Sequence, residues 1–148
     1  MYDTILLPTD GSDASLSAAA HAGRLAQTAD AAVHVLSVAD SRNRFESPSS
    51  GIAPDAWRDA ERERAEAAVA DAVETLPDGV PVERTVVEGV PHTEIVAATE
   101  DVDADVVVMG THGRTGLDHY LVGSVTERVV RRSPAPVLTI RDDDAAVR

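Results

Sequence analysis

The chain contains 148 residues without a cysteine, and its 26 acidic and 13 basic residues give a net charge of −13. The absence of cysteine excludes disulfides, thiolate nucleophiles and cysteine-ligated zinc, and the negative charge argues against nucleic acid or an anionic membrane as a partner. Every basic residue is an arginine, which excludes the lysine-dependent phosphate loop GxxxxGK(S/T), Schiff-base chemistry and a lysine general base.

The first part of the chain alternates between apolar runs and a helical pattern. Residues 4–7 are apolar and are stopped by Pro8 and a turn-forming segment, which predicts a buried strand. Ser12 is a suitable N-cap for a helix that has small residues on its inner face. Residues 32–39 are largely apolar at both odd and even positions, so we predict an interior strand there.

A segment rich in serine and proline, residues 41–54, is predicted to form a flexible surface loop. The alanine-rich helical pattern over residues 55–76 follows it. Opposite charges three residues apart, including Glu61 with Arg64, predict a solvated outer face for this helix. The residues expected to face the core are Ala56, Ala60, Ala67, Val69, Val73 and Leu76.

The second half of the chain repeats the alternation. Strands are predicted over residues 82–87, 106–109 and 137–140, and helices over 92–100 and 124–132. Ser124 with Glu127 three residues later has the pattern of a capping box at the start of the last helix. The prolines before the last strand favour an edge position, and the polar tail over 141–148 is expected to fray.

Five strands alternating with four helices predict one α/β domain over residues 1–148, with helices on both faces of a parallel sheet. If the strands take the order 3-2-1-4-5, the winding reverses between the first and fourth strands. Ligands of such sheets bind beyond the carboxyl ends of the strands at this point. Residues 8–10 and 110–124 lie at those ends, so Asp10 and a glycine-rich loop are expected side by side.

The glycine-rich loop has the spacing G-x2-G-x9-G-(S/T), formed by Gly110, Gly113, Gly123 and Ser124. Glycines let a backbone approach a ligand closely, and a helix N-terminus attracts anions, so the loop predicts a phosphate site. From spacing alone, it is equally possible that Gly110 and Gly123 only end a strand and begin a helix. The candidate phosphate ligands from this reasoning are Gly113, Arg114, Gly123, Ser124 and Thr126.

Asp10 has two interpretations of the same kind. Its carboxylate can accept hydrogen bonds from both hydroxyls of a ribose, or it can form a turn before Gly11. His92, His112 and His119 match no recognised metal-binding spacing, so we predict no metal site built by the protein.

Three stretches, LLPTDGS at 6–12, VEGVPHTEIV at 87–96 and MGTHGRTGLDHYLVGSVTERVV at 109–130, closely resemble the universal stress protein family. The resemblance covers essentially residues 2–140, and the complete glycine signature is that of the ATP-binding branch. It implies a Rossmann-like three-layer sandwich with sheet order 3-2-1-4-5, a homodimer, and ATP or another adenine nucleotide as ligand. The implied base and ribose contacts are Pro8, Thr9, Asp10, Val35 and Met109, and the implied phosphate contacts are Gly110, Gly113, Gly123, Ser124 and Thr126. Arg114, for its charge, and Val125 complete the set of predicted phosphate-binding residues.

We therefore expect an ATP-binding stress-response or regulatory protein that dimerises through the edge strand 137–140 and hydrolyses ATP slowly at most. Mg²⁺ accompanying the nucleotide would be held mainly by the phosphates. The alternatives are a dimeric interaction module without nucleotide and a weak ATPase or phosphotransfer enzyme. The absence of a long apolar run or a signal-like start predicts a cytoplasmic protein, and the acidic, lysine-free composition favours a high-salt cytoplasm over that of an ordinary mesophile.

Overall fold

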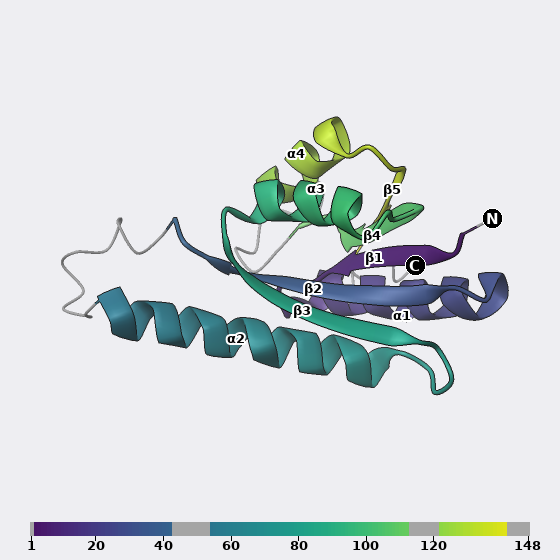
Figure 1. The fold of residues 1–148 in the computed structure, drawn as a ribbon, viewed down its shortest axis with the longest axis horizontal. Helices are drawn as coiled ribbons and strands as arrows, with labels where there is room; N and C mark the ends of the chain where they lie inside the picture. Colours follow the sequence, from purple (N-terminus) through teal and green to yellow (C-terminus); the bar gives the residue numbers. More distant parts are fainter. Residues whose placement is uncertain (1, 43–53, 113–121, 142–148) are drawn as a thin grey trace.

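A computed structural model, which describes residues 2–42, 54–112 and 122–141, has a parallel sheet between two layers of helices (Figure 1). The strands are β1 (Thr4–Pro8), β2 (Ala32–Asp40), β3 (Val82–Gly89), β4 (Val106–Gly110) and β5 (Val137–Ile140). Their order is β3-β2-β1-β4-β5, and neighbouring strands are parallel. The predicted fold class and strand order are confirmed.

The helices are α1 (Asp13–Ala29), α2 (Pro54–Thr75), α3 (Pro91–Asp101) and α4 (Ser124–Arg132). Helices α1 and α2 cover one face of the sheet, and α3 and α4 cover the other (Figure 1). Strand β2 supplies side chains to both layers, because successive residues point to opposite faces. Val33 and Val35 pack toward α1 and α2, whereas Leu36 and Val38 pack toward α3 and α4.

Helix α1 begins as predicted, because the Ser12 side chain accepts a hydrogen bond from the Ser15 N–H at 3.2 Å. Its buried face consists mainly of alanines, so the helix lies close to the sheet. Gly11, just before the cap, has a φ of +83°, a conformation that glycine adopts without a steric penalty. A β-carbon built at Gly11 would lie 3.5 Å from the Ala68 Cβ, so this turn also contacts α2.

Helix α2 has a different buried face from the one predicted. Val69 and Leu76 are buried and Val73 packs against the core, but Ala56, Ala60 and Ala67 are exposed. Ala65, Ala68 and Ala72 take their places in the interior. Because alanine occurs all around this helix, its apolar period did not determine which side faces the sheet.

The start of α4 also differs from the prediction. Gly123 is the N-cap and no side chain of the described residues caps the helix, so the capping box that begins at Ser124 was wrong. Ser124 is the first helical residue, and Glu127 instead pairs with Arg131 at 3.7 Å along the helix. Within the part of the chain that the structure describes, no capping hydroxyl or carboxylate accepts the backbone N–H groups of the first turn of α4.

Most of the predicted surface loop 41–54 and of the polar tail 141–148 lies outside the described residues. Pro54 belongs to the first turn of α2, where a proline is tolerated because its missing N–H would have no helical partner. Within the described ranges, none of the helices combines the length and apolar character needed to cross a membrane.

Candidate functional site

A cavity of about 470 Å³ opens at the carboxyl edge of the sheet, where the ends of β1 and β4 diverge. This volume suits a small organic ligand, and the position is the one at which doubly wound sheets bind ligands. The walls also include parts of β2, α2, α3 and α4. The predicted site residues that line it are Pro8, Thr9, Asp10, Met109, Gly110, Gly123, Ser124, Val125 and Thr126.

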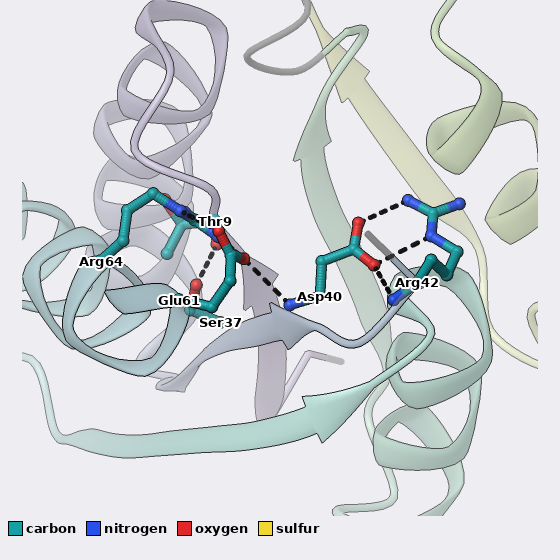
Figure 2. A network of polar contacts seen from close by, with 6 residues as sticks. All are labelled: Thr9, Ser37, Asp40, Arg42, Glu61 and Arg64. Atoms are coloured by element: carbon teal, nitrogen blue, oxygen red, sulfur yellow. Dashed lines mark hydrogen bonds and ion pairs between the residues drawn. The ribbon is translucent and has the colours of Figure 1, made fainter. Parts of the chain in front are cut away.

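Thr9, which follows the last residue of β1, makes hydrogen bonds through its N–H, its hydroxyl and its carbonyl. Its N–H donates to the Leu36 carbonyl at 2.9 Å, and its hydroxyl donates to the Ser15 Oγ at 3.1 Å. The Ser37 hydroxyl donates to the Thr9 carbonyl at 2.7 Å (Figure 2). With these bonds and only 6% exposure, Thr9 forms a rigid part of the wall rather than an adaptable ligand contact.

Asp10 follows directly, and its turn-forming role is confirmed, whereas its contact with a ribose stays a prediction. Its Oδ1 accepts a hydrogen bond from the Ser12 N–H at 3.0 Å, which is the turn geometry expected of an aspartate before a glycine. The same half-buried side chain lines the cavity. The turn thus orients a carboxylate at the cavity wall, where it can accept further hydrogen bonds.

The N-terminus of α4 forms another part of the wall. Gly123 donates its N–H to the Thr111 carbonyl at 2.6 Å, so this N–H is not directed at a ligand as the sequence analysis expected. The N–H groups of Ser124, Val125 and Thr126 belong to the first turn, which has no carbonyl of its own helix to accept them. All three residues line the cavity, and the helix dipole adds partial positive charge there. This turn can bind an anion.

Gly110 and Gly123 both lie where a β-carbon would crowd neighbouring backbone, and the contact is closer at Gly110. A β-carbon at Gly110 would lie 2.9 Å from the Ala14 carbonyl carbon, and one at Gly123 would lie 3.1 Å from the His112 Cα. Gly110 therefore lets α1 approach the end of β4, and Gly123 lets the chain enter α4 beside His112. The remaining signature residues Gly113 and Arg114 lie outside the described part of the chain.

The placement of Val35 in the base-binding pocket was wrong. Val35 is fully buried in the apolar layer beneath α1 and α2, on the face of β2 that points away from the cavity. Leu36 and Val38 lie on the other face and line the cavity together with Met109. The side-chain alternation was predicted correctly, but not which face of the strand borders the site.

The two described histidines near the site differ in environment. His112 lines the cavity, and its Nδ1 lies 3.2 Å from the Thr111 Oγ1. Burial, followed by the positive charges of Arg128, Arg132 and Arg42, lowers the pKa of His92 below its ordinary value of 6.5, so its imidazole is neutral at pH 7. Over residues 2–42, 54–112 and 122–141, no three His, Asp or Glu side chains gather as a metal site.

The family model of the universal stress proteins matches residues 1–141. The chain belongs to this family. A universal stress protein of Methanocaldococcus jannaschii is 39% identical over 145 residues, covering 95% of this chain and 83% of the relative. This confirms the resemblance that was based on the three sequence stretches.

Solved structures of universal stress proteins have the same fold. One from M. jannaschii superposes with a TM-score of 0.81 at 34% identity, covering 95% of this chain and 96% of that chain. Another, solved in complex with cAMP, superposes with a TM-score of 0.70 at 29% identity, covering 95% and 98%. One of the solved proteins that share this fold was therefore determined with a bound nucleotide.

In this universal stress protein, four charged residues at or beside the cavity were missed by the sequence analysis. Asp40 binds Arg42 through two side-chain hydrogen bonds of 2.9 and 2.7 Å, and Glu61 binds Arg64 through bonds of 3.2 and 2.6 Å (Figure 2). The solvated face predicted for Glu61 and Arg64 was wrong, because their side chains are only 12% and 27% exposed. Because alanine occurs all around α2, the sequence contained no signal that would have placed this ion pair beside the cavity.

Proposed function

We propose that this universal stress protein binds an adenine nucleotide, ATP foremost, in the cavity between β1 and β4. One observation carries the proposal: Asp10 and the uncapped first turn of α4 line the same cavity. A carboxylate suits the hydroxyls of a ribose, and a free helix N-terminus suits phosphates. The nucleotide would lie across the gap with its sugar at Asp10 and its phosphates at residues 124–126.

The wall between these two ends favours an aromatic base. Leu36, Val38 and Met109 contribute apolar surface there, and such surface accommodates the faces of a purine. The similarity to a universal stress protein solved with cAMP supports an adenine-containing ligand. We also assign phosphate contacts to Gly113 and Arg114, which lie outside the described residues.

The chain has no lysine to neutralise the phosphates. Backbone N–H groups, arginine and a Mg²⁺ ion bound mainly by the phosphates would balance their charge. Among the described cavity residues, His112 and Asp10 already make hydrogen bonds within the protein. We therefore propose a regulatory binding protein with at most slow hydrolysis, acting as a homodimer through β5 in a high-salt cytoplasm.

Calorimetric titration with ATP and Mg²⁺ in concentrated KCl tests the proposal. Binding should appear, and ATP at a hundred times its dissociation constant should raise the free energy of unfolding by about 2.7 kcal/mol. Asp10→Asn keeps an oxygen for the Ser12 N–H but removes the charge, so ATP affinity should fall while the fold is retained. Neither heat nor thermal shift with any adenine nucleotide would favour the interaction module instead.

A turnover measurement separates binding from catalysis. Release of phosphate from bound ATP should remain slow compared with nucleotide exchange, and replacement of His112 by alanine should leave that rate unchanged. Rapid turnover that disappears in His112→Ala would show an ATPase and contradict the proposed binding role.

A further inference from the structure

Ser37 of β2 is a polar residue in an otherwise apolar layer of the core. Successive strand residues point to opposite faces, so Ser37 shares the face of Val33 and Val35, which points toward α1 and α2 and away from the cavity. It is 1% exposed. A buried hydroxyl costs free energy unless it forms a hydrogen bond, and the Ser37 Oγ donates to the Thr9 carbonyl at 2.7 Å (Figure 2). Ser37 therefore holds the chain just beyond β1 from a position that a ligand in the cavity does not touch.

This bond acts on the peptide group that joins Thr9 to Asp10. The carbonyl of Thr9 and the N–H of Asp10 belong to one planar unit, so a donor that fixes the carbonyl oxygen also fixes the plane from which the Asp10 side chain departs. The N–H of Thr9 donates to the Leu36 carbonyl at 2.9 Å. Strand β2 thus holds Thr9 through both of its backbone polar groups and determines the direction in which the chain enters Asp10.

The turn that begins at Asp10 is shaped by bonds of its own. Asp10 Oδ1 accepts the Ser12 N–H at 3.0 Å, and the Thr9 hydroxyl accepts the Gly11 N–H at 3.3 Å. These contacts join residues within the turn, so they set its shape but not its position relative to the sheet. The bond from Ser37 crosses from β2 to the start of the turn and connects the two.

Building on the nucleotide site proposed above, we propose that Ser37 is the positioning residue for the carboxylate of Asp10. Its bond to the Thr9 carbonyl holds that carboxylate where it accepts the hydroxyls of the ribose. Ser37 thereby determines the affinity for the ribose of the ligand without contacting the ligand itself. The phosphates are bound independently at the first turn of α4.

Titrations with adenosine, AMP and ATP test this assignment in the full chain. Ser37→Ala removes the donor, and it should weaken all three ligands by the same factor, about threefold to tenfold for one lost hydrogen bond. Ser37→Thr keeps the donor and should retain wild-type affinity. The matched control is Ser133→Ala beyond the far end of α4, where a serine Oγ also donates to a carbonyl, that of Ala135, at 2.7 Å; its affinities should equal those of the wild type.

Two further measurements distinguish positioning of Asp10 from a general disturbance of the cavity. In an Asp10→Ala background, Ser37→Ala should cause no additional loss of affinity, because the group that it positions is already absent. Wild type and Ser37→Ala should also bind 2′,3′-dideoxy-ATP equally, since this analogue lacks both hydroxyls that Asp10 would bind. Ser37→Cys, a weaker donor of similar size, should show a loss in the same direction if Ser37→Ala folds poorly.

Unchanged ATP affinity in the folded Ser37→Ala protein would overturn the proposal. A loss that persists in full with Asp10→Ala or with the dideoxy analogue would also overturn it, because the effect would then not pass through Asp10. Absence of ATP binding to the wild type would instead overturn the nucleotide site itself, which is a different result from ATP binding that ignores Ser37.

Discussion

Thr126 donates a hydrogen bond from its Oγ1 to the carbonyl oxygen of Gly110 at 2.8 Å. The bond joins the first turn of α4 to the last residue of β4, across the ends of the glycine-rich loop. Both partners line the cavity and Thr126 is only 3% exposed. The hydroxyl therefore fixes the position of the turn that we propose as the phosphate site.

Thr126→Val should lower both stability and ATP affinity. Valine has nearly the shape of threonine but cannot donate, so the free energy of unfolding should fall by about 1 to 3 kcal/mol. Thr126→Ser keeps the hydroxyl and serves as the control in chemical denaturation and calorimetry. Equal affinity in Thr126→Val and Thr126→Ser would mean that the bond does not position the turn.

Gly123→Val should reduce the affinity for ATP more than that for adenosine. The φ of Gly123 is −64°, which any residue can adopt, but a β-carbon would approach the His112 Cα to 3.1 Å. The branched side chain should displace the chain at the entry to α4 and with it the phosphate contacts, at a modest loss of stability. Titrations of both ligands check this, and an unchanged ratio of the two affinities would place the phosphates elsewhere.

Leu138→Arg should convert the proposed dimer into a monomer. Strand β5 is an edge of the sheet, and Leu138 is 37% exposed on it. A charge at a buried subunit contact is costly when it has no partner. Sedimentation velocity should show the change, whereas Ala67→Arg on the exposed side of α2 adds the same charge and should leave the oligomer intact. A Leu138→Arg protein that sediments like the wild type would place the contact elsewhere.

Asp105 should make the stability depend on acidic pH. Its Oδ2 accepts the N–H groups of Asp3 and Thr4 at 2.8 and 3.0 Å, and these bonds hold the pKa of the carboxyl below its ordinary value of 3.8. Because the folded pKa is the lower one, the stabilisation is present above pH 3.8 and is lost as pH falls through the folded value.

Asp105→Asn should therefore melt at a lower temperature than the wild type at pH 7, and the difference should shrink as the pH is lowered below about 4. Thermal denaturation over a pH series measures this. Asp78→Asn, at an exposed position, is the control for loss of one negative charge. A difference between Asp105→Asn and wild type that does not vary with pH would mean that the carboxylate charge is not involved.

The strands and their order could be predicted because each apolar run has a turn signal after it and the alternation with helices leaves few topologies. The same reasoning brought Asp10 and the start of α4 to one edge of the sheet. Both features follow from local sequence signals and from general rules for connecting strands and helices, and a single sequence is enough to apply them.

The errors concern which face of a strand or helix points toward the cavity or the core. Val35 was taken from the family resemblance, and because both faces of β2 are apolar, only the arrangement of the helices shows that Val38, not Val35, borders the cavity. The alanines of α2 left its rotation undetermined, so the ion pair of Glu61 with Arg64 was placed in solvent. At α4, the spacing of Ser124 and Glu127 suggested a cap one residue too late. The orientation of β2 and α2 depends on contacts between segments that are distant in sequence.

The close approach of α1 to Gly110 changes how the glycine signature can be used. Even alanine at this position would bring its Cβ to 2.9 Å from the Ala14 carbonyl carbon, whether or not a ligand is present. A relative without a nucleotide site but with the same approach of α1 to β4 would still favour glycine at this position. The first glycine of the motif therefore reports on the fold, and the evidence for a working site must come from the first turn of α4 and from Asp10.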